Sequence, residues 1–409
     1  MKRSFWIIGI LFVLLLCGAV YYLPQHWEFL FPPAVHPQPE VKQASIYIDT
    51  SSYATLLQMV DVVRQQDTNP KFIFWQRLRH LNPKDPLLQN ATLFFNDPTK
   101  KSKTFLKRLQ LHLKHFVDTY PNASFIVHLN KNHNAVVWAV LRNIPKERIV
   151  QLHFYEESFA SSAFSMGGPI VDRSHAIELL NQTKTPGFFG IDYASSLMQV
   201  YPSIFHIGYP QYTMTIPYKK RILERLPRLE PVDFTQIAKE LTPQQKKDLL
   251  RLANIQEKDM APFQQGKPVI LYTLGYFSEA RKNNEQQIAL FEKVYTGQTP
   301  YVSNPQEYVW VYKEHPWPSH SRFIADTMAD KFPSVYALPK EFPLEILFLT
   351  GYMPDKVFGY SSSLFFALPK EHVLFFIQRI NDPYLPILYD MGILTKQQVV
   401  SYEDFGLSR

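Results

Sequence analysis

Residues 309–320, VWVYKEHPWPSH, place titratable side chains at the end of a strand-like segment. The apolar alternation stops at Lys313 and His315, and Pro316 cannot donate to a sheet ladder, so the strand is predicted to end there. A protonated histidine at a strand end can donate a proton to a ligand, which is the chemistry of a general acid. A His-Pro pair is also common strand punctuation, so this segment alone leaves both interpretations open.

A carboxylate and a group of serines follow within fifty residues. Glu345 lies in a predicted helix of leucine and phenylalanine, where an isolated carboxylate is unusual unless it faces a ligand. Ser361, Ser362 and Ser363 lie between KVFGY and LFF, at a strand-to-helix junction that can bind phosphate. With His315, these groups predict a nucleotide-sugar site. Taken singly, the serines are equally typical of a helix N-cap, and Glu345 of a salt bridge.

The first half of the chain has two further candidate groups. The segment LHFYEESFASS ends a predicted buried strand with Glu156 and Glu157, and adjacent glutamates can supply one general base. The segment HLNKNHN puts His128 and His133 after another strand, where His133 could bind a substrate. A solvated turn and a capping histidine are the structural alternatives for these two segments.

The elements that would position these groups alternate between strand and helix. The segments ASIYIDTSSYATLLQMVDVVRQQ, SFIVHLN and RIVQLHFYEES, with the helical segments between them, form a βαβαβ pattern typical of a parallel, doubly wound sheet. Residues 215–262 are charged and helical, and KPVILYTLG starts a second α/β unit near Gly266. The sequence therefore predicts two domains, 45–265 and 266–400, followed by a tail, 401–409. Ligands bind where the carboxyl ends of such strands meet.

Composition excludes several classes of protein. The 409 residues are 46% hydrophobic and 19% charged with a net charge of +7, which indicates a globular chain suited to small anionic ligands. The basic residues form no arm or nucleic-acid-binding motif, so no nucleic acid is expected. The single cysteine, Cys17, excludes disulfides within the chain. GxGxxG, P-loop, HExxH, GxSxG and Asp-X-Asp motifs are missing, so neither a metal nor another cofactor is expected.

The N-terminus has the features of a membrane anchor. Lys2 and Arg3 precede an apolar run over residues 5–23, which is about long enough to cross a bilayer. We predict an uncleaved signal anchor over residues 1–23 and a Pro-rich linker over residues 24–44. A lipoprotein signal acting through Cys17 is the alternative. The basic flank puts the N-terminus in the cytoplasm and the body of the chain outside.

With these residues in view, the chain resembles the bacterial sialyltransferases of glycosyltransferase family 80, the Pasteurella and Photobacterium type. The segments that carry the resemblance are YKEHP, FPLEILFLTGYMPDKVFGYSSSLFFALPKE and DPYLPILYDMGILTKQQVVSYEDF, and more thinly IYIDTSSYATLLQMVD, HLNKNH, YEES and ELTPQQ. The resemblance implies a GT-B architecture, in which two Rossmann-like domains face a cleft. It also implies metal-independent, inverting transfer of sialic acid from a CMP donor to a hydroxyl of a glycan acceptor, which is expected to be galactosyl.

The resemblance also implies roles for individual residues. Glu157 would be the catalytic base and His315 the acid that protonates the departing phosphate, and Glu345 would hold the ribose hydroxyls. The remaining residues would bind substrate: Ser362 and Ser363 the phosphate, Lys313 and Pro316 the cytidine, and His133 the donor or acceptor sugar. The family's acceptor-side tryptophan falls near Tyr276-Phe277.

Two departures leave the exact activity open. YEES replaces the family's Asp-Asp-Gly, which makes Glu157 one methylene longer and puts Ser158 in place of glycine; Lys-Glu-His-Pro replaces Lys-Gly-His-Pro. Transfer of another CMP-activated nonulosonic acid and a non-catalytic CMP-binding surface protein are therefore the alternatives. A bacterial inner-membrane location is expected, but CMP-sugars are made in the cytoplasm, which conflicts with a body outside. Acceptor, linkage, membrane side and oligomeric state stay open.

Overall fold

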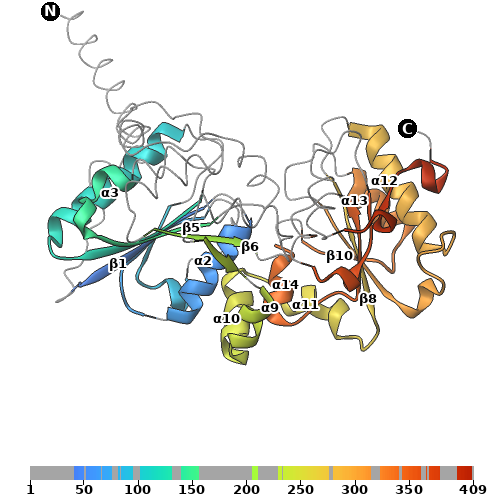
Figure 1. Ribbon diagram of the computed structural model, residues 1–409, viewed down its shortest axis with the longest axis horizontal. Helices are drawn as coiled ribbons and strands as arrows, with labels where there is room; N and C mark the ends of the chain where they lie inside the picture. The colour runs from blue at the N-terminus through green and yellow to red at the C-terminus, as the bar shows by residue number, and fades with distance from the viewer. Residues whose placement is uncertain are drawn as a thin grey trace, which may run out of the picture.

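The computed structural model has two α/β halves joined by short helices (Figure 1). The described residues are 41–49, 52–65, 67–75, 82, 84–94, 102–130, 140–155, 205–210, 229–232, 234–275, 280–314, 323–339, 343–360, 365, 368–377 and 394–407. The predicted anchor, residues 1–23, lies outside them and stays a prediction. None of the helices within the described ranges is long and apolar enough to cross a membrane.

The first sheet is entirely parallel in its described strands. Its strands are β1 (Gln43–Asp49), β2 (Lys71–Trp75), β3 (Ala91–Leu93), β4 (Ser124–Asn130), β5 (Ile149–Tyr155), β6 (Phe205–Pro210) and β7 (Leu229–Val232). Their spatial order is β3-β2-β1-β4-β5-β6-β7. The order in which successive strands are added therefore reverses between β1 and β4, which is the topological switch point of a doubly wound sheet.

The second sheet repeats this order. Its strands are β8 (Val269–Thr273), β9 (Val309–Lys313), β10 (Tyr336–Ala337), β11 (Lys356–Tyr360), β12 (Val373–Ile377) and β13 (Val399–Val400). They run parallel in the order β10-β9-β8-β11-β12-β13, so the switch point lies between β8 and β11. The predicted doubly wound α/β organisation is thus present in both halves of the chain.

Helices cover both faces of the two sheets. The α-helices are α2 (Ser52–Gln65), α3 (Ser102–Thr119), α9 (Phe234–Glu240), α10 (Pro243–Leu252), α11 (Glu257–Met260), α12 (Ala280–Tyr295), α13 (Phe323–Lys331) and α14 (Glu345–Thr350). Short 3-10 helices lie at Pro86–Leu88, Lys146–Arg148, Ala261–Gln264, Pro305–Glu307, Lys370–His372, Lys396–Gln398 and Glu403–Phe405.

Local sequence explains where several of these helices form. In α2, Leu56, Leu57, Val60 and Val63 recur at helical spacing, and all four are buried against the first sheet. The α10 helix begins after Thr242, whose hydroxyl accepts from the Gln245 backbone N–H at 3.2 Å while the Gln245 side chain accepts from the Thr242 N–H at 3.0 Å. The ELTPQQ segment therefore starts a helix, within the stretch predicted to be helical.

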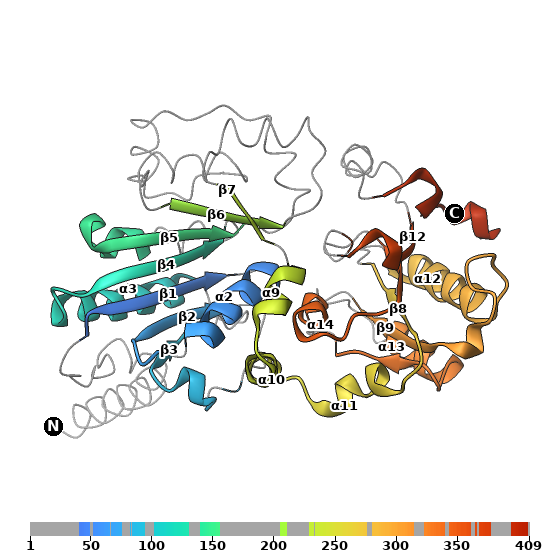
Figure 2. The same cartoon turned by 60° about the horizontal axis from the view of Figure 1, so that its bottom comes forward.

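One hydrophobic cluster runs from the first sheet into the second. It joins α2 and the first sheet to α9, α10 and α14, and through them to Leu271, Val311 and Val357 of the second sheet. Figure 2 shows α9, α10 and α14 lying between the two sheets, with β1, β4 and β5 pointing toward the second half. The opposite face of the second sheet has its own core under α12 and α13. The carboxyl ends of β1, β4 and β5 are therefore directed at the second half.

Candidate active site

Three residues form a row across the carboxyl end of the second sheet. Lys313 of β9 pairs with Thr273 of β8, and Thr273 pairs on its other side with Gly359 of β11. The row crosses the switch point between β8 and β11, and from the strand spacing its outer members lie about 10 Å apart. Doubly wound sheets bind ligands outside this edge, at this point in the strand order. Lys313 therefore lies at the edge of the second sheet where this fold class binds its ligands.

Gly359 allows β11 and β8 to approach closely at this edge. Its φ is +143°, and a Cβ built on it would lie 2.2 Å from the carbonyl oxygen of Thr273 and 2.3 Å from its Oγ1. No side chain fits such a position, since real Cβ contacts stay beyond about 3 Å. Two residues after Gly359, the chain enters the serine cluster. The glycine therefore permits the close pairing of β11 with β8 directly before the predicted phosphate-binding serines in the sequence.

Lys313 is a buried cation at the end of β9. Lys313 is 6% exposed, and its Nζ donates to the backbone carbonyl of Glu314 at 3.0 Å. Buried ammonium groups are costly unless other groups compensate the charge. The end of β9 at Lys313 agrees with the strand end predicted before Pro316. The lysine lies where its charge can act on an anionic ligand beyond the sheet edge.

Glu345 is the first residue of α14 and is 5% exposed. A carboxylate in the first turn of a helix is favoured by the helix dipole. The helix ends at Gly351, whose φ is +90° and whose N–H donates to the Leu347 carbonyl at 2.9 Å. The helix connects β10 to β11 and packs on α9 and α10. The predicted helical setting of Glu345 is confirmed, and its predicted ribose contact stays a prediction.

The other predicted site residues lie outside the described residues. These are Glu157, His315, His133, Pro316, Ser362 and Ser363, and Tyr276-Phe277 also lie there. The described chain reaches to within two residues of most of them, because β5 ends at Tyr155, β9 at Lys313 and β11 at Tyr360. Among the described residues, no group of three or more His, Cys, Asp or Glu side chains could hold a metal ion.

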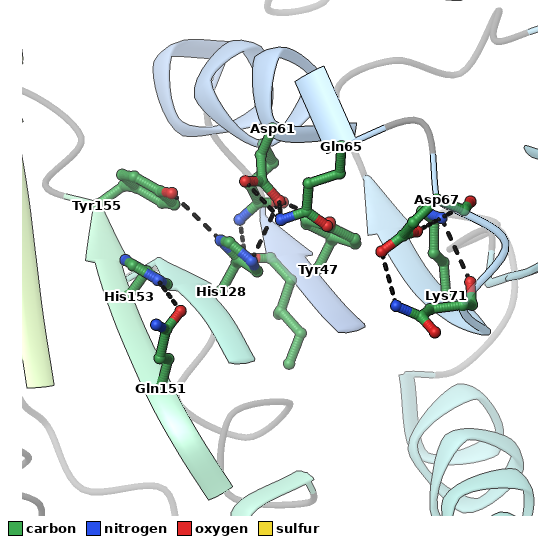
Figure 3. A network of polar contacts seen from close by, with 12 residues as sticks. Tyr47, Asp61, Gln65, Asp67, Lys71, His128, Gln151, His153 and Tyr155 are labelled. Carbon is green, nitrogen blue, oxygen red and sulfur yellow. Dashed lines mark hydrogen bonds and ion pairs between the residues drawn. The ribbon is translucent and has the colours of Figure 1, made fainter. Parts of the chain in front are cut away.

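The first sheet contains a polar cluster that the sequence did not reveal (Figure 3). Tyr47 of β1, His128 of β4 and His153 of β5 occupy one row of the sheet. The His128 ring stacks between them, 4.5 Å from the Tyr47 ring and 4.9 Å from the His153 ring. Sequence analysis placed His128 after its strand, but it lies inside β4, which continues to Asn130. Polar side chains at strand positions that are otherwise apolar were the signal available in the sequence.

Hydrogen bonds link this row to α2 and to the end of β5. The Tyr47 hydroxyl donates to Asp61 Oδ2 at 2.7 Å, and Gln65 Nε2 donates to both Asp61 oxygens at 2.9 and 3.0 Å. His128 Nδ1 lies 3.2 Å from the Tyr155 hydroxyl, and Nε2 lies 3.4 Å from Asp61 Oδ2. Nε2 makes no regular hydrogen bond to any described residue. The cluster is therefore tightest at Asp61 and reaches the last residue of β5.

Burial determines the charges in this cluster. Complete burial lowers the pKa of His128 to about 3, and burial likewise raises the pKa of Asp61. Both shifts oppose an ion pair, although the two side chains are close enough to form one, so we describe His128 as neutral. With Nε2–H directed at Asp61, Nδ1 accepts the hydrogen bond that the Tyr155 hydroxyl donates. This tautomer is assigned from the partners of the two nitrogens.

A neutral buried histidine makes stability depend on pH. Unfolded chains bind a proton at His128 below pH 6.5, whereas the folded protein does so only near pH 3, so stability falls as pH drops through this window. From pH 7.5 to 4.5 we expect a loss of about 2–3 kcal/mol from this group. The free energy of unfolding in urea, determined between pH 7.5 and 4.5 for wild type and for His128→Gln, measures this loss.

The difference between wild type and variant isolates His128 from other groups. Burial lowers the pKa of His112 to about 4, which adds a slope of the same sign. The raised pKa of Asp61 acts in the opposite direction, because the folded protein keeps a proton that the unfolded chain releases above pH 3.8. Both groups are present in the two proteins. Equal pH slopes in the two proteins would contradict a neutral buried His128.

Comparison with known proteins gives one match to a protein-family model, mostly in the second half of the chain. Residues 194–384 match the family model described as sialyltransferase PMO188. The resemblance to the sialyltransferases is confirmed. The match includes Lys313, His315, Glu345 and the serine cluster, whereas Glu157 and His133 precede it. No curated protein is similar enough in sequence to count as a match.

Solved sialyltransferases share the fold. An α/β-galactoside α-2,3-sialyltransferase from Photobacterium phosphoreum aligns with a TM-score of 0.70 at 17% identity, over 89% of this chain and 100% of that one. A 2,6-sialyltransferase from Photobacterium sp. JT-ISH-224, solved with the donor product CMP and the acceptor substrate lactose, aligns with a TM-score of 0.68 at 17% identity, over 89% and 80% of the chains. The predicted GT-B fold with two parallel sheets is thus confirmed.

Proposed function

We propose that this chain is an inverting, metal-independent sialyltransferase that moves sialic acid from CMP-sialic acid to a hydroxyl of a galactosyl glycan. The observation that carries the proposal is the match of the sialyltransferase family model across residues 194–384. That stretch holds the predicted donor-side residues Lys313, His315 and Glu345 on one Rossmann-like half. A related fold solved with CMP and lactose supports the same pair of substrates.

The proposed reaction needs one acid and one base on opposite sides of the reacting carbon. The bond between the anomeric carbon and the CMP phosphate oxygen breaks, and its electron pair stays with the phosphate. His315 donates a proton to that phosphate, which stabilises the charge of the leaving group. Glu157 removes the proton from the acceptor hydroxyl as its oxygen bonds to the anomeric carbon from the opposite face, so the configuration inverts.

Binding residues hold the donor in place for this step. In the proposal Glu345 holds the ribose hydroxyls, Ser362 and Ser363 the phosphate, and Lys313 and Pro316 the cytidine. His133 contacts one of the sugars from the first half. The row formed by Lys313, Thr273 and Gly359 supports a nucleotide at the carboxyl edge of the second sheet, because this is the switch point of the strand order. No metal enters the proposed step, consistent with the missing Asp-X-Asp pair.

CMP release measures the proposed activity. The full chain in mild detergent is incubated with CMP-Neu5Ac and EDTA, with and without lactose. Lactose-dependent CMP release supports the proposal. Calorimetric binding of CMP without any release would overturn the choice of donor or acceptor and favour another CMP-activated nonulosonic acid. Loss of both release and CMP binding would overturn the nucleotide site and favour a non-catalytic protein.

We also propose that residues 1–23 anchor the chain in the bacterial inner membrane as a single pass, because Lys2 and Arg3 precede an apolar run of suitable length. Alkaline carbonate washing of cell membranes tests this. The full chain is expected to stay with the membrane fraction, and a chain without residues 1–40 to be released. Protease treatment of intact spheroplasts then identifies the side on which the body lies.

A further inference from the structure

The polar cluster between α2 and the first sheet lies in an unusual place. Central strands of parallel sheets are covered on both faces and are typically apolar. Here Tyr47 and His128 are 0% and 1% exposed, and they lie across the switch point between β1 and β4. Each is two residues from the end of its strand, at the edge that points toward the second half (Figure 2). Buried polar groups at such an edge call for a functional explanation.

The cluster holds the His128 ring in one orientation. Tyr47 and His153 stack on its two faces at interplanar angles of 18° and 15°, which prevents the ring from turning out of its own plane. Asp61, fixed by Tyr47 and Gln65, lies 3.4 Å from Nε2 (Figure 3). The ring therefore presents Nδ1 in a constant direction. Nδ1 accepts the hydrogen bond from the Tyr155 hydroxyl at 3.2 Å.

Tyr155 is the last residue of β5, and Glu157 follows it by two residues in the sequence. We propose that Tyr155, held by His128, is a positioning residue for Glu157, the proposed catalytic base two residues later in the sequence. The inference rests on the proposed function, in which Glu157 is the base. It deepens that function by assigning a role to side chains that the reaction itself does not use.

Energetics favour this role over a purely stabilising one. Leucine or valine in place of a buried histidine and tyrosine would stabilise the sheet without the desolvation cost of the polar groups. A catalytic carboxylate gains from a rigid supporting group, because misplacement by about 1 Å can cost about a hundredfold in rate. Glu157 itself stands where the resemblance gives the family an aspartate, so its longer side chain depends more strongly on where the backbone is held.

Tyr155→Phe tests the inference, since it removes only the hydroxyl and keeps the ring. We expect kcat for lactose-dependent CMP release to fall about tenfold, with the KM for CMP-Neu5Ac within about twofold of wild type. The melting temperature is expected to stay within about 3 °C. Tyr295→Phe is the matched control, because it removes a tyrosine hydroxyl that lies 2.8 Å from Ser334 Oγ on the exposed side of the second half. This control is expected to keep wild-type kcat.

A double variant separates positioning from loss of structure. If Tyr155 acts through Glu157, Tyr155→Phe is expected to lower kcat by less than about twofold in a Glu157→Gln background. His128→Asn and His128→Gln give a second test on the partner side chain. The asparagine amide reaches the place of Nδ1, and the glutamine amide reaches that of Nε2. The kcat of His128→Asn is therefore expected to be at least about fivefold higher than that of His128→Gln.

The failure of this inference is distinct from the failure of the proposed function. If the wild-type chain releases no CMP, the proposed function fails first. If wild type is active and Tyr155→Phe matches it in kcat, the positioning role is overturned. An undiminished tenfold effect in the Glu157→Gln background, or equal losses in His128→Asn and His128→Gln, would also overturn it. A melting temperature lowered far beyond that of Tyr295→Phe would assign Tyr155 to stability alone.

Discussion

Gly359→Ala is expected to destabilise the folded protein by at least about 4 kcal/mol, which is a large fraction of the roughly 5–15 kcal/mol that stabilises a typical folded domain. The added Cβ would lie 2.2 Å from the carbonyl oxygen of Thr273, and the residue would have to keep a φ of +143°. Strand β11 pairs with β8 at this residue, so neither strand can move aside without breaking the centre of the second sheet. Soluble yield and urea unfolding of the variant measure the effect.

Gly351→Ala provides a matched control for the backbone conformation. Gly351 also has a positive φ, +90°, but a Cβ there would meet nothing within 4 Å. We therefore expect a loss of about 1–2 kcal/mol, the usual cost of a left-handed conformation for a residue with a Cβ. The difference between the two variants is the cost of the overlap with Thr273. Equal losses in the two variants would show that the approach of β11 to β8 is looser than in the structure.

A second change distinguishes side-chain overlap from backbone overlap. Thr273→Ala removes the Oγ1 that would lie 2.3 Å from the new Cβ, but it leaves the carbonyl oxygen in place. The double variant Gly359→Ala/Thr273→Ala is therefore expected to stay about as unstable as Gly359→Ala alone. Recovery of more than half of the lost stability would place the conflict at Oγ1 instead of at the backbone.

Gly359 illustrates what the sequence could and could not predict. The segment KVFGY indicated a strand because its apolar residues suit a pleated, buried surface, and β11 occupies those residues. The close approach at its glycine depends on which strand lies beside it. That neighbour, β8, is more than eighty residues away in sequence, and no local pattern specifies the pairing.

The polar cluster of the first sheet shows the same limit. Helix α2 was predicted from the spacing of Leu56, Leu57, Val60 and Val63, and its bounds follow that pattern. The contact of Asp61 with Tyr47 and His128 depends on how far α2 lies along the sheet. Period and propensity do not determine this position, so a residue that appears solvent-exposed on a helical wheel joins a buried network.

The donor side was the most predictable part of the candidate site. The end of β9 could be located because a proline acts within a few residues, and Lys313 lies at that end. Glu345 was predicted to lie in a helix, and α14 begins at it. The roles of His315, Glu157 and the serines came from the resemblance to the sialyltransferases. Their contacts depend on loops whose conformation no local signal determines, so those roles stay predictions.

His315→Ala is expected to lower kcat for lactose-dependent CMP release by about 10²–10⁴-fold, because a positioned acid contributes a factor of this size. In the proposed reaction the phosphate leaves with a developing negative charge, and the variant lacks the proton donor that stabilises it. Affinity for CMP is expected to stay within about fivefold, since the proposal assigns the binding of the nucleotide to Glu345, Lys313 and the serines. Steady-state kinetics and calorimetric titration with CMP measure the two effects.

His372→Ala is the matched histidine control. His372 Nδ1 lies 2.8 Å from the carbonyl oxygen of Pro354 in the same half of the chain, so its loss tests whether any histidine contact of this half lowers kcat. We expect wild-type kcat, with only a modest change in melting temperature. A loss of kcat in this control as large as that in His315→Ala would assign both effects to folding.

Glu345→Gln completes the argument, because the proposal gives it the opposite kinetic signature from His315→Ala. A glutamine at the start of α14 keeps the shape of the buried side chain but weakens the hydrogen bonds that a carboxylate accepts from ribose hydroxyls. We expect CMP affinity to fall about tenfold and kcat at saturating donor to fall less than about threefold. If instead His315→Ala loses CMP binding while Glu345→Gln loses kcat, the two roles are exchanged and the departing phosphate lies nearer to α14 than to the end of β9.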